Sequence, residues 1–281
     1  MEPTSLTNAI DNATKVANTP FFTTIIDKIT GFKLSQWAAE GEIRKQLIHD
    51  EYHKAKENGI VGMQYIKYMR QMSNLLEIAA KSATYIDQNK SNNIQMDNDF
   101  FWNIIEHSKT ISNDEMQKLI AKIIAGEYNQ PGLYSMSTLH ILKMLGKQEL
   151  SLFENMSSFC INSSQIPKDI FVLSLAGSLA SNMLKLDFGD LQTLQHLGLF
   201  LPNEMTEIID FSQNNVFSIN YFNEKIQFKS INDELSSFQV PGYFALSNSG
   251  KQILQHLNPQ FNEEYFNWLK SNYKVPGLVL M

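Results

Sequence analysis

The chain has 281 residues and a single cysteine, Cys160, so it cannot form a disulfide within itself. A lone cysteine between apolar neighbours is typical of a buried thiol in a reducing compartment. The most apolar stretch, residues 170–184, is too short and too rich in serine and glycine to span a bilayer. Residues 1–18 lack the basic-then-apolar order of a secretory signal. The sequence therefore predicts a cytoplasmic protein without a transmembrane segment, although the short apolar run 20–26 leaves contact with a membrane surface open.

Motifs for catalysis and cofactor binding are also scarce. There is no glycine-rich phosphate loop, no Cys-x-x-Cys pair and no Gly-x-Ser-x-Gly nucleophile turn. His49 and His53 have a spacing that can bind zinc, but Asp50 stands where a zinc protease has glutamate, and no third ligand follows. We therefore expect no catalytic residue, no metal site and no cofactor.

Basic residues are too few for a typical nucleic-acid surface. The formal net charge is −6, and residues 151–281 hold 7 Lys/Arg against 12 Asp/Glu, a net of −5. Neutralising phosphates normally requires a local basic excess. Protein partners are thus favoured over nucleic acid, which stays as the alternative.

Helical periodicity dominates the first third of the chain. We expect short helices over 4–17 and 21–33, then a long helical stretch over 34–88 that breaks near Asn58. Apolar residues spaced by three and four run from Tyr65 to Ile86, which is the pattern of a coiled-coil seam. The seam predicts either the buried face of a bundle helix or a homodimer through residues 65–86. A polar linker over 87–98 closes this first domain, residues 1–88.

The next domain, residues 99–165, has the clearest helix signals. Ser112 and Glu115 form the pattern of a capping box, and apolar residues at helical spacing follow it. Gly126 is expected to end that helix, and the Pro131-Gly132 turn to prevent its continuation. Two further helices, beginning at Ser135 and Lys147, complete a compact helical unit.

The third domain, residues 166–281, combines helices with strands. Helices are expected over 167–184 and 187–200, and a β-hairpin over 216–229. A short strand over 242–246 and two final helices follow. This order predicts a mainly α protein whose C-terminal part is a winged-helix-like α+β unit. Its would-be recognition helix carries no lysine or arginine, which favours protein contact over DNA contact.

Five residues are candidates for contact with a partner. They are polar side chains beside the Pro-Gly turn and on the hairpin: Gln117, Glu127, Gln130, Lys225 and Lys229. Glu127 has two interpretations, because a carboxylate there can hold the turn or meet a partner.

Residues 100–153 resemble a bacterial family known as domain of unknown function 2806, which is similar to the abortive-infection alpha proteins. The resemblance is carried by Phe101-Trp102, residues 111–119, Ala121 to Glu127, Gln130 to Gly132, Ser135, Thr138-Leu139, Leu142-Lys143 and Leu145. It implies a bacterial cytoplasmic factor, with relatives in anti-phage defence, and no catalytic residues. Ser137 stands where the family commonly has arginine.

The sequence thus favours a non-enzymatic protein-interaction or regulatory factor, which the resemblance associates with anti-phage defence. A winged-helix nucleic-acid-binding regulator is the alternative. An enzyme or membrane-active toxin without a recognisable motif is the third hypothesis.

Overall fold

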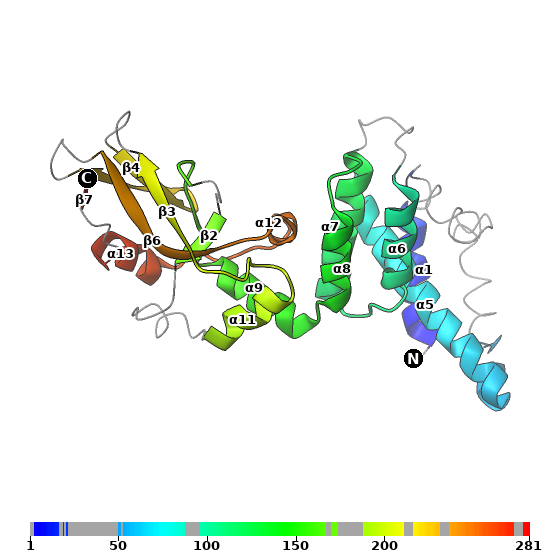
Figure 1. The fold of residues 1–281 in the computed structure, drawn as a ribbon. Coiled ribbons are helices and arrows are strands. Elements are labelled where there is room, and N and C mark those ends of the chain that lie inside the picture. The colour runs from blue at the N-terminus through cyan, green and yellow to red at the C-terminus, as the bar shows by residue number, and fades with distance from the viewer. Residues whose placement is uncertain are drawn as a thin grey trace. The chain divides into compact units, whose positions relative to one another are not determined.

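The computed structural model divides the chain into two compact units, Met1–Leu139 and His140–Met281 (Figure 1). The structure describes residues 3–16, 19, 21, 50–51, 53–87, 96–166, 170–173, 188–210, 216–230, 236–272 and 278–281. Apart from Phe21, the helix predicted over 21–33 lies outside these residues, as do residues 34–49, the centre of the predicted linker and residues 174–184.

The N-terminal unit is built of helices packed around one long central helix. Its elements are α1 (Pro3–Val16), α5 (Gly59–Ala83), α6 (Asn98–Ser108), α7 (Asp114–Asn129) and the start of α8 (Met136–Met144). The central helix α5 contacts α1, α6 and α7. The prediction of a helix over 4–17 is confirmed by α1.

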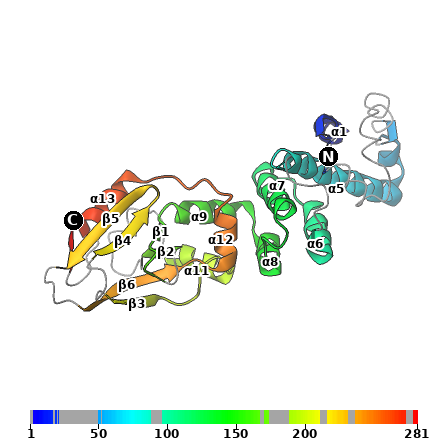
Figure 2. The ribbon, with the colours of Figure 1, turned by 90° about the horizontal axis from the view of Figure 1, so that it is seen from above.

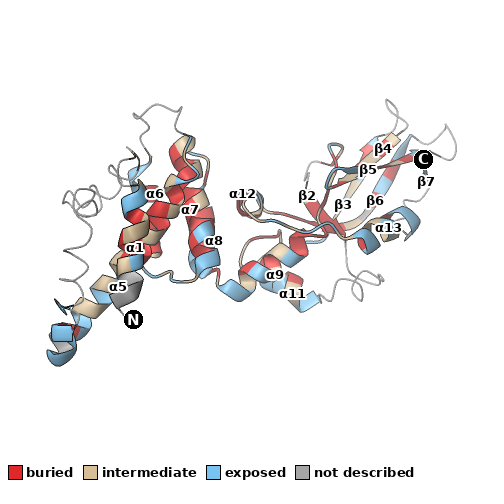
Figure 3. Ribbon diagram, turned by 180° about the vertical axis from the view of Figure 1, so that it is seen from behind, coloured by how far each residue is buried: buried red, intermediate tan, exposed pale blue. Residues whose placement is uncertain are grey.

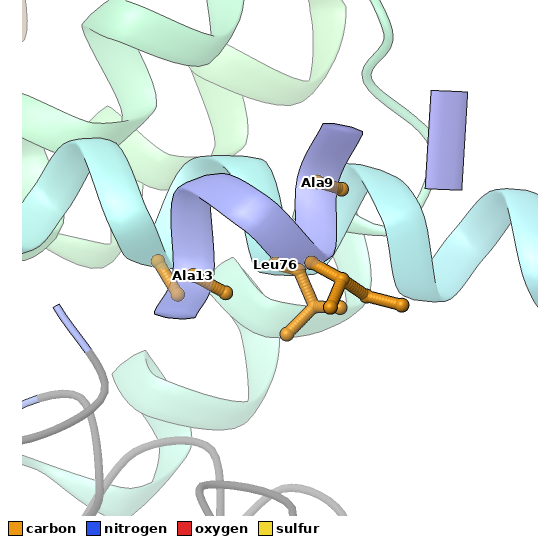
Figure 4. Packing of buried hydrophobic residues seen from close by; sticks show 5 residues of the cluster. Ala9, Ala13 and Leu76 are labelled. Carbon is orange, nitrogen blue, oxygen red and sulfur yellow. The ribbon is translucent and has the colours of Figure 1, made fainter. Parts of the chain in front are cut away.

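Small side chains bring α1 close to α5. Ala9 and Ala13 of α1 pack against Leu76 and Ala79 of α5, and all four are buried (Figure 4). Alanine allows two helix backbones to approach closely, so little space is left for water. Leu76 and Ala79 belong to the predicted seam, and Met69 of the same seam packs against this cluster. Part of the seam is therefore covered from within the chain, which supports the bundle interpretation; the homodimer stays a prediction.

Helix α7 begins and ends one turn or less from the predicted places. Its N-cap is Asn113, whose side chain accepts a hydrogen bond of 3.1 Å from the backbone N of Met116, so the predicted cap at Ser112 is one residue too early. Gly126 does not end the helix, which continues to Asn129. A helix in water would tend to stop at this glycine, but here the helix is held by packing on both sides.

The C-terminal unit combines helices with an antiparallel sheet (Figure 2). Its helices are α9 (Lys147–Ser157), α11 (Phe188–His196), α12 (Asn248–Leu254) and α13 (Glu263–Asn272). Its strands are β1 (Ile161–Asn162), β2 (Ile170–Leu173), β3 (Met205–Asp210), β4 (Val216–Tyr221), β5 (Glu224–Ser230), β6 (Ser237–Ala245) and β7 (Leu278–Leu280).

The sheet shows that the predicted fold class is wrong. Seven strands of the described residues form one sheet in the order β3-β6-β2-β1-β4-β5-β7, and every pairing is antiparallel. The C-terminal unit is thus a substantial α+β domain and not a winged-helix-like unit with a small hairpin. The predicted hairpin itself is confirmed, with Tyr221 paired to Glu224 across a two-residue turn.

The sequence missed β2 and most of the sheet, although the short strand predicted over 242–246 overlaps the end of β6. β2 pairs with β6, and Phe171 lies opposite Ala245. Three of the four residues of β2 are buried, so the strand lacks the alternation that reveals a half-exposed strand, and its apolar run was assigned to a helix over 167–184. β6 contains Pro241-Gly242 in its middle, and its ladder with β3 is irregular between Met205 and Glu207.

Aromatic side chains form much of the core beneath the sheet. Phe217 lies 5.0 Å from Phe238 and 6.1 Å from Phe228, measured between ring centroids. Figure 3 shows buried residues along these strands and exposed residues on the outer side of α13. The strands of this sheet therefore have one well-packed apolar face. This packing holds the β4–β5 hairpin, which carries the exposed lysines and the aromatic cluster described below.

Candidate functional site

Glu127 holds the turn that follows α7. Its side chain is 1% exposed, and its two carboxylate oxygens accept hydrogen bonds from the backbone N of Gly132 (2.6 Å) and of Tyr134 (3.1 Å). A buried carboxylate is costly unless hydrogen bonds satisfy it, and two backbone donors do so here. Gly132 has a φ of +82°, a conformation that glycine adopts without strain. The carboxylate and the glycine together fix the path of residues 130–134.

Gly126 leaves space for the Tyr134 side chain, which follows the same turn. A Cβ at this position would lie 2.4 Å from the Tyr134 hydroxyl oxygen, well inside contact distance. The Tyr134 ring is buried and stacks on Phe100, with 6.4 Å between ring centroids. The ring has little space in which to move, so a glycine at position 126 is what lets α7 and the turn pack together.

Ser135 and Thr138 start α8 directly after the turn. The backbone N of Thr138 donates to the Ser135 hydroxyl at 3.2 Å, and the two hydroxyls are 3.0 Å apart. This is the side-chain capping expected of serine at a helix start. Five residues of the sequence pattern therefore have a role in folding: Gly126, Glu127, Gly132, Ser135 and Thr138.

A polar network joins α5 to the start of α7. Lys81 donates to the buried Gln117 side chain and forms an ion pair of 2.9 Å with Asp114, which also pairs with Lys118 at 2.7 Å. The Gln117 amide in turn donates to the carbonyl of Ile111 at 3.0 Å. Hydrogen bonds from Lys118 and then Lys81 lower the pKa of Asp114 below its ordinary value. Unlike charges at the N-terminus of α7 thus tie two helices together.

The five candidate contact residues fall into three settings. Gln117 and Glu127 are buried and engaged within the chain, whereas Gln130 is exposed on the turn that Glu127 holds. Lys225 and Lys229 are exposed on β5 and, four residues apart, project from the same face of the strand. The structure therefore connects the Glu127 carboxylate of α7 to the turn that carries Gln130. It places the two lysines on one face of one strand.

An aromatic cluster at the hairpin turn was not anticipated from the sequence. Phe222 and Phe261 are exposed, with 5.6 Å between their ring centroids, and Tyr221 and Phe266 adjoin them. Lys270 places its Nζ atom 4.2 Å from the centroid of Phe266. The sequence offered one signal, an aromatic residue at a two-residue hairpin turn where asparagine or glycine is usual.

Cys160 is a free thiol and is not part of a metal-binding group among the described residues. Burial raises the pKa of the Cys160 thiol, so a reactive thiolate is disfavoured. Among the described residues, no group of three or more His, Cys, Asp or Glu side chains could hold a metal ion. His49 of the predicted histidine pair lies outside the described residues. No helix in the described part of the chain is long and apolar enough to cross a membrane.

The protein has two units, the first helical and the second α+β. The sequence pattern around Glu127 forms a turn that is held by hydrogen bonds to this buried carboxylate. A family model described as "Protein of unknown function (DUF2806)" matches residues 63–270. The chain belongs to this family, and the match covers both units, well beyond the residues 100–153 on which the resemblance rested. No curated protein and no solved structure matches the chain.

Proposed function

We propose that this chain is a non-enzymatic protein-interaction or regulatory factor, and that the turn at residues 130–132 belongs to its contact surface. The observation that supports this is the pair of hydrogen bonds from Gly132 and Tyr134 to the buried carboxylate of Glu127. These bonds hold Gln130, Pro131 and Gly132, all exposed, in one conformation. A preorganised loop loses little conformational entropy when a partner binds it.

Under this proposal, Glu127 holds the turn directly and contributes to partner contact indirectly. Its carboxylate does not itself meet the partner but shapes the segment that does. Gln130 supplies an amide that can donate and accept hydrogen bonds, and Pro131 supplies a rigid apolar surface. Gln117 lies at the opposite end of α7 from the turn, where its hydrogen bond with Lys81 of α5 helps to hold the helix in place.

The proposed setting is the cytoplasm of a bacterium, in defence against phages. This part of the proposal rests on the resemblance to abortive-infection alpha proteins. The acidic balance of residues 151–281 supports protein contact over binding to nucleic acid. Lys225 and Lys229 are proposed as a further, separate contact point on β5.

Site-specific crosslinking tests the contact surface. A photo-crosslinking amino acid replaces Gln130 in the full chain, expressed in its native host. The matched control places it at Gln64, which is also exposed but lies on α5. We expect one protein to be captured from position 130 and not from position 64, and Glu127→Ala to reduce that capture. Equal capture from both positions, or salt-dependent binding of the pure chain to duplex DNA, would contradict the proposal.

Infection assays test the proposed setting separately. Deleting the gene should increase the plating efficiency of at least one phage in the native host, and the wild-type gene should restore it. Plating that stays unchanged over a broad phage panel would remove the defence role, while the contact proposal would still be judged by crosslinking.

A further inference from the structure

Two exposed aromatic rings form a pair on the surface of the C-terminal unit. Phe222 is 38% exposed and Phe261 is 44% exposed, and the two rings meet at an interplanar angle of 72°. Phe222 lies in the turn between β4 and β5, and Phe261 lies two residues before α13. Burying large aromatic rings stabilises a fold, so rings left in water at one place call for a functional explanation.

Phe222 adopts a backbone conformation that does not suit it. Its φ is +53°, and it is the one residue other than glycine with positive φ among the described residues. For a bulky residue this conformation is strained, and asparagine or glycine would occupy the turn at less cost. Strain of this kind is concentrated at binding and catalytic sites. The sequence thus keeps an aromatic ring at a position where folding alone favours another residue.

The base of the aromatic pair is rigid. The buried Tyr221 hydroxyl donates to the carbonyl of Ser158 at 2.7 Å and accepts from the backbone N of Asn262 at 2.9 Å. The Ser158 hydroxyl accepts from the backbone N of Gln260, also at 2.9 Å. These bonds fix the segment that carries Phe261 against the strand that leads to Phe222. Both rings are therefore held in place before any ligand arrives.

Carboxylates outnumber lysines beside the aromatic pair, with three carboxylates against Lys225 and Lys270, so the local charge favours a cation. Exposed carboxylates flank both rings in sequence, with Glu224 two residues beyond Phe222, and Glu263 and Glu264 just beyond Phe261. The same cluster already holds one cation, because Lys270 lies over the face of Phe266. The face of an aromatic ring attracts a guanidinium or ammonium group, and nearby carboxylates strengthen that attraction.

We propose that Phe222 and Phe261 bind an arginine or lysine side chain in a basic segment of a partner protein. The rings contact the apolar stem and the face of the cation, and the carboxylates at positions 224, 263 and 264 balance its charge. A nucleobase could also stack on these rings, but its phosphates would face the three carboxylates and be repelled. The inference rests on the proposed role in protein contact and adds an aromatic contact surface to the turn at residues 130–132 and the lysines of β5.

Titration calorimetry with the full chain tests this proposal. The probe is a short peptide of alternating arginine and glycine, and the matched probe carries citrulline in place of each arginine. Citrulline keeps the shape of the side chain but has no charge. We expect the arginine peptide to bind the chain and the citrulline peptide to bind at least about tenfold more weakly.

Two variants separate binding from folding. Phe222→Asn removes the ring and relieves the backbone, so we expect an unchanged melting temperature and arginine-peptide binding about tenfold weaker. Phe188→Ala is the control, because Phe188 is also exposed, at 55%, but lies on α11. It should leave binding unchanged.

Three outcomes of the peptide experiments would overturn the inference. They are no binding of the arginine peptide, equal binding of the two peptides, and full binding by the folded Phe222→Asn variant. Binding of a single-stranded oligonucleotide that is lost in the same variant would also overturn it in favour of nucleic acid. If crosslinking from position 130 still captures a partner in any of these cases, the proposed function stands and only the aromatic surface of Phe222 and Phe261 is removed.

Discussion

Glu127 illustrates how much a single buried carboxylate does in this protein. Its two hydrogen bonds replace the water that the charge would otherwise require, and they connect the end of α7 to the backbone beyond the turn. Gly126 beside it provides the space for Tyr134. Two adjacent residues thus determine where the exposed residues of the turn lie.

Replacing Glu127 should destabilise the N-terminal unit. In Glu127→Ala the two backbone N–H groups lose their acceptor in a buried site, so we expect a loss of about 2–3 kcal/mol in the free energy of unfolding. Urea denaturation followed by circular dichroism measures it. Glu115→Gln, an exposed change on the same helix, should shift stability by less than about 0.5 kcal/mol. Equal effects of the two changes would show that the Glu127 hydrogen bonds are unimportant.

Asp114 should make a small, pH-dependent contribution. Its pKa in the folded chain is lowered from 3.8, mainly by hydrogen bonds from Lys118 and Lys81. A lowered folded pKa means that the stabilisation is fully present above the unfolded value and is lost as the pH falls through the folded pKa. Because the side chain is 60% exposed, solvent screening keeps the contribution below about 1 kcal/mol.

Comparing wild type with Asp114→Asn over a pH series tests this sign. The wild type should be the more stable of the two near neutral pH, and the difference should shrink as the pH falls below 3.8. A difference that grows on acidification would contradict the assignment.

At the scale of elements, Tyr221 and Gln165 each form hydrogen bonds to two backbone groups and so connect segments that are distant in sequence. The Tyr221 hydroxyl connects β4 to the end of α9 and to the residue before α13. Burial raises the pKa of Tyr221, so its hydroxyl stays protonated and able to donate. Gln165 does the same beside β4, where its amide pairs with the backbone N of Ser218 and the carbonyl of Val216.

Removing the Tyr221 hydroxyl should weaken the attachment of β4 to Ser158 and Asn262 without disturbing the packing of the ring. Tyr221→Phe leaves a buried carbonyl and a buried N–H without this partner, so we expect a loss of about 1–3 kcal/mol. Thermal unfolding measures the change, and amide exchange at Asn262 localises it. Tyr68→Phe, at an exposed tyrosine of α5, serves as the control and should be neutral. If Asn262 exchanges no faster in Tyr221→Phe, the hydroxyl does not anchor α13.

At the scale of the whole molecule, two units of different architecture share one chain and one family model. The first unit is held by contacts between helices, chiefly α1 with α5 and α5 with α7, whereas the second is organised around one antiparallel sheet. The first unit also buries part of its longest apolar stripe against α1, which bears on the assembly state of the protein.

Deleting residues 1–16 should promote self-association. Without α1, Leu76 and Ala79 become exposed on a helix that retains coiled-coil spacing. Light scattering should give a larger mass for the truncated chain than for the full chain at equal concentration. Replacing Leu76 by lysine in the truncated chain should reverse the association. An unchanged mass after truncation would show that the stripe does not drive pairing.

The sequence by itself predicted the described helices of the N-terminal unit, the β4–β5 hairpin and the family. These features depend on neighbours three or four residues apart, on caps and on turn residues, all of which are readable locally. It also identified the segment around Glu127 as informative, without distinguishing a structural carboxylate from a contact residue.

Only the tertiary structure decided the rest. The sheet joins β2 to β6, which are far apart in sequence, and pairing of this kind depends on which edges meet in space. The sequence predicted part of β6 as a short strand but gave no strand signal for β2, of which three of four residues are buried. The need for glycine at position 126 depends on Tyr134, and the aromatic pair depends on the fold bringing positions 222 and 261 together. Contacts between distant residues outweighed local propensity at each of these places.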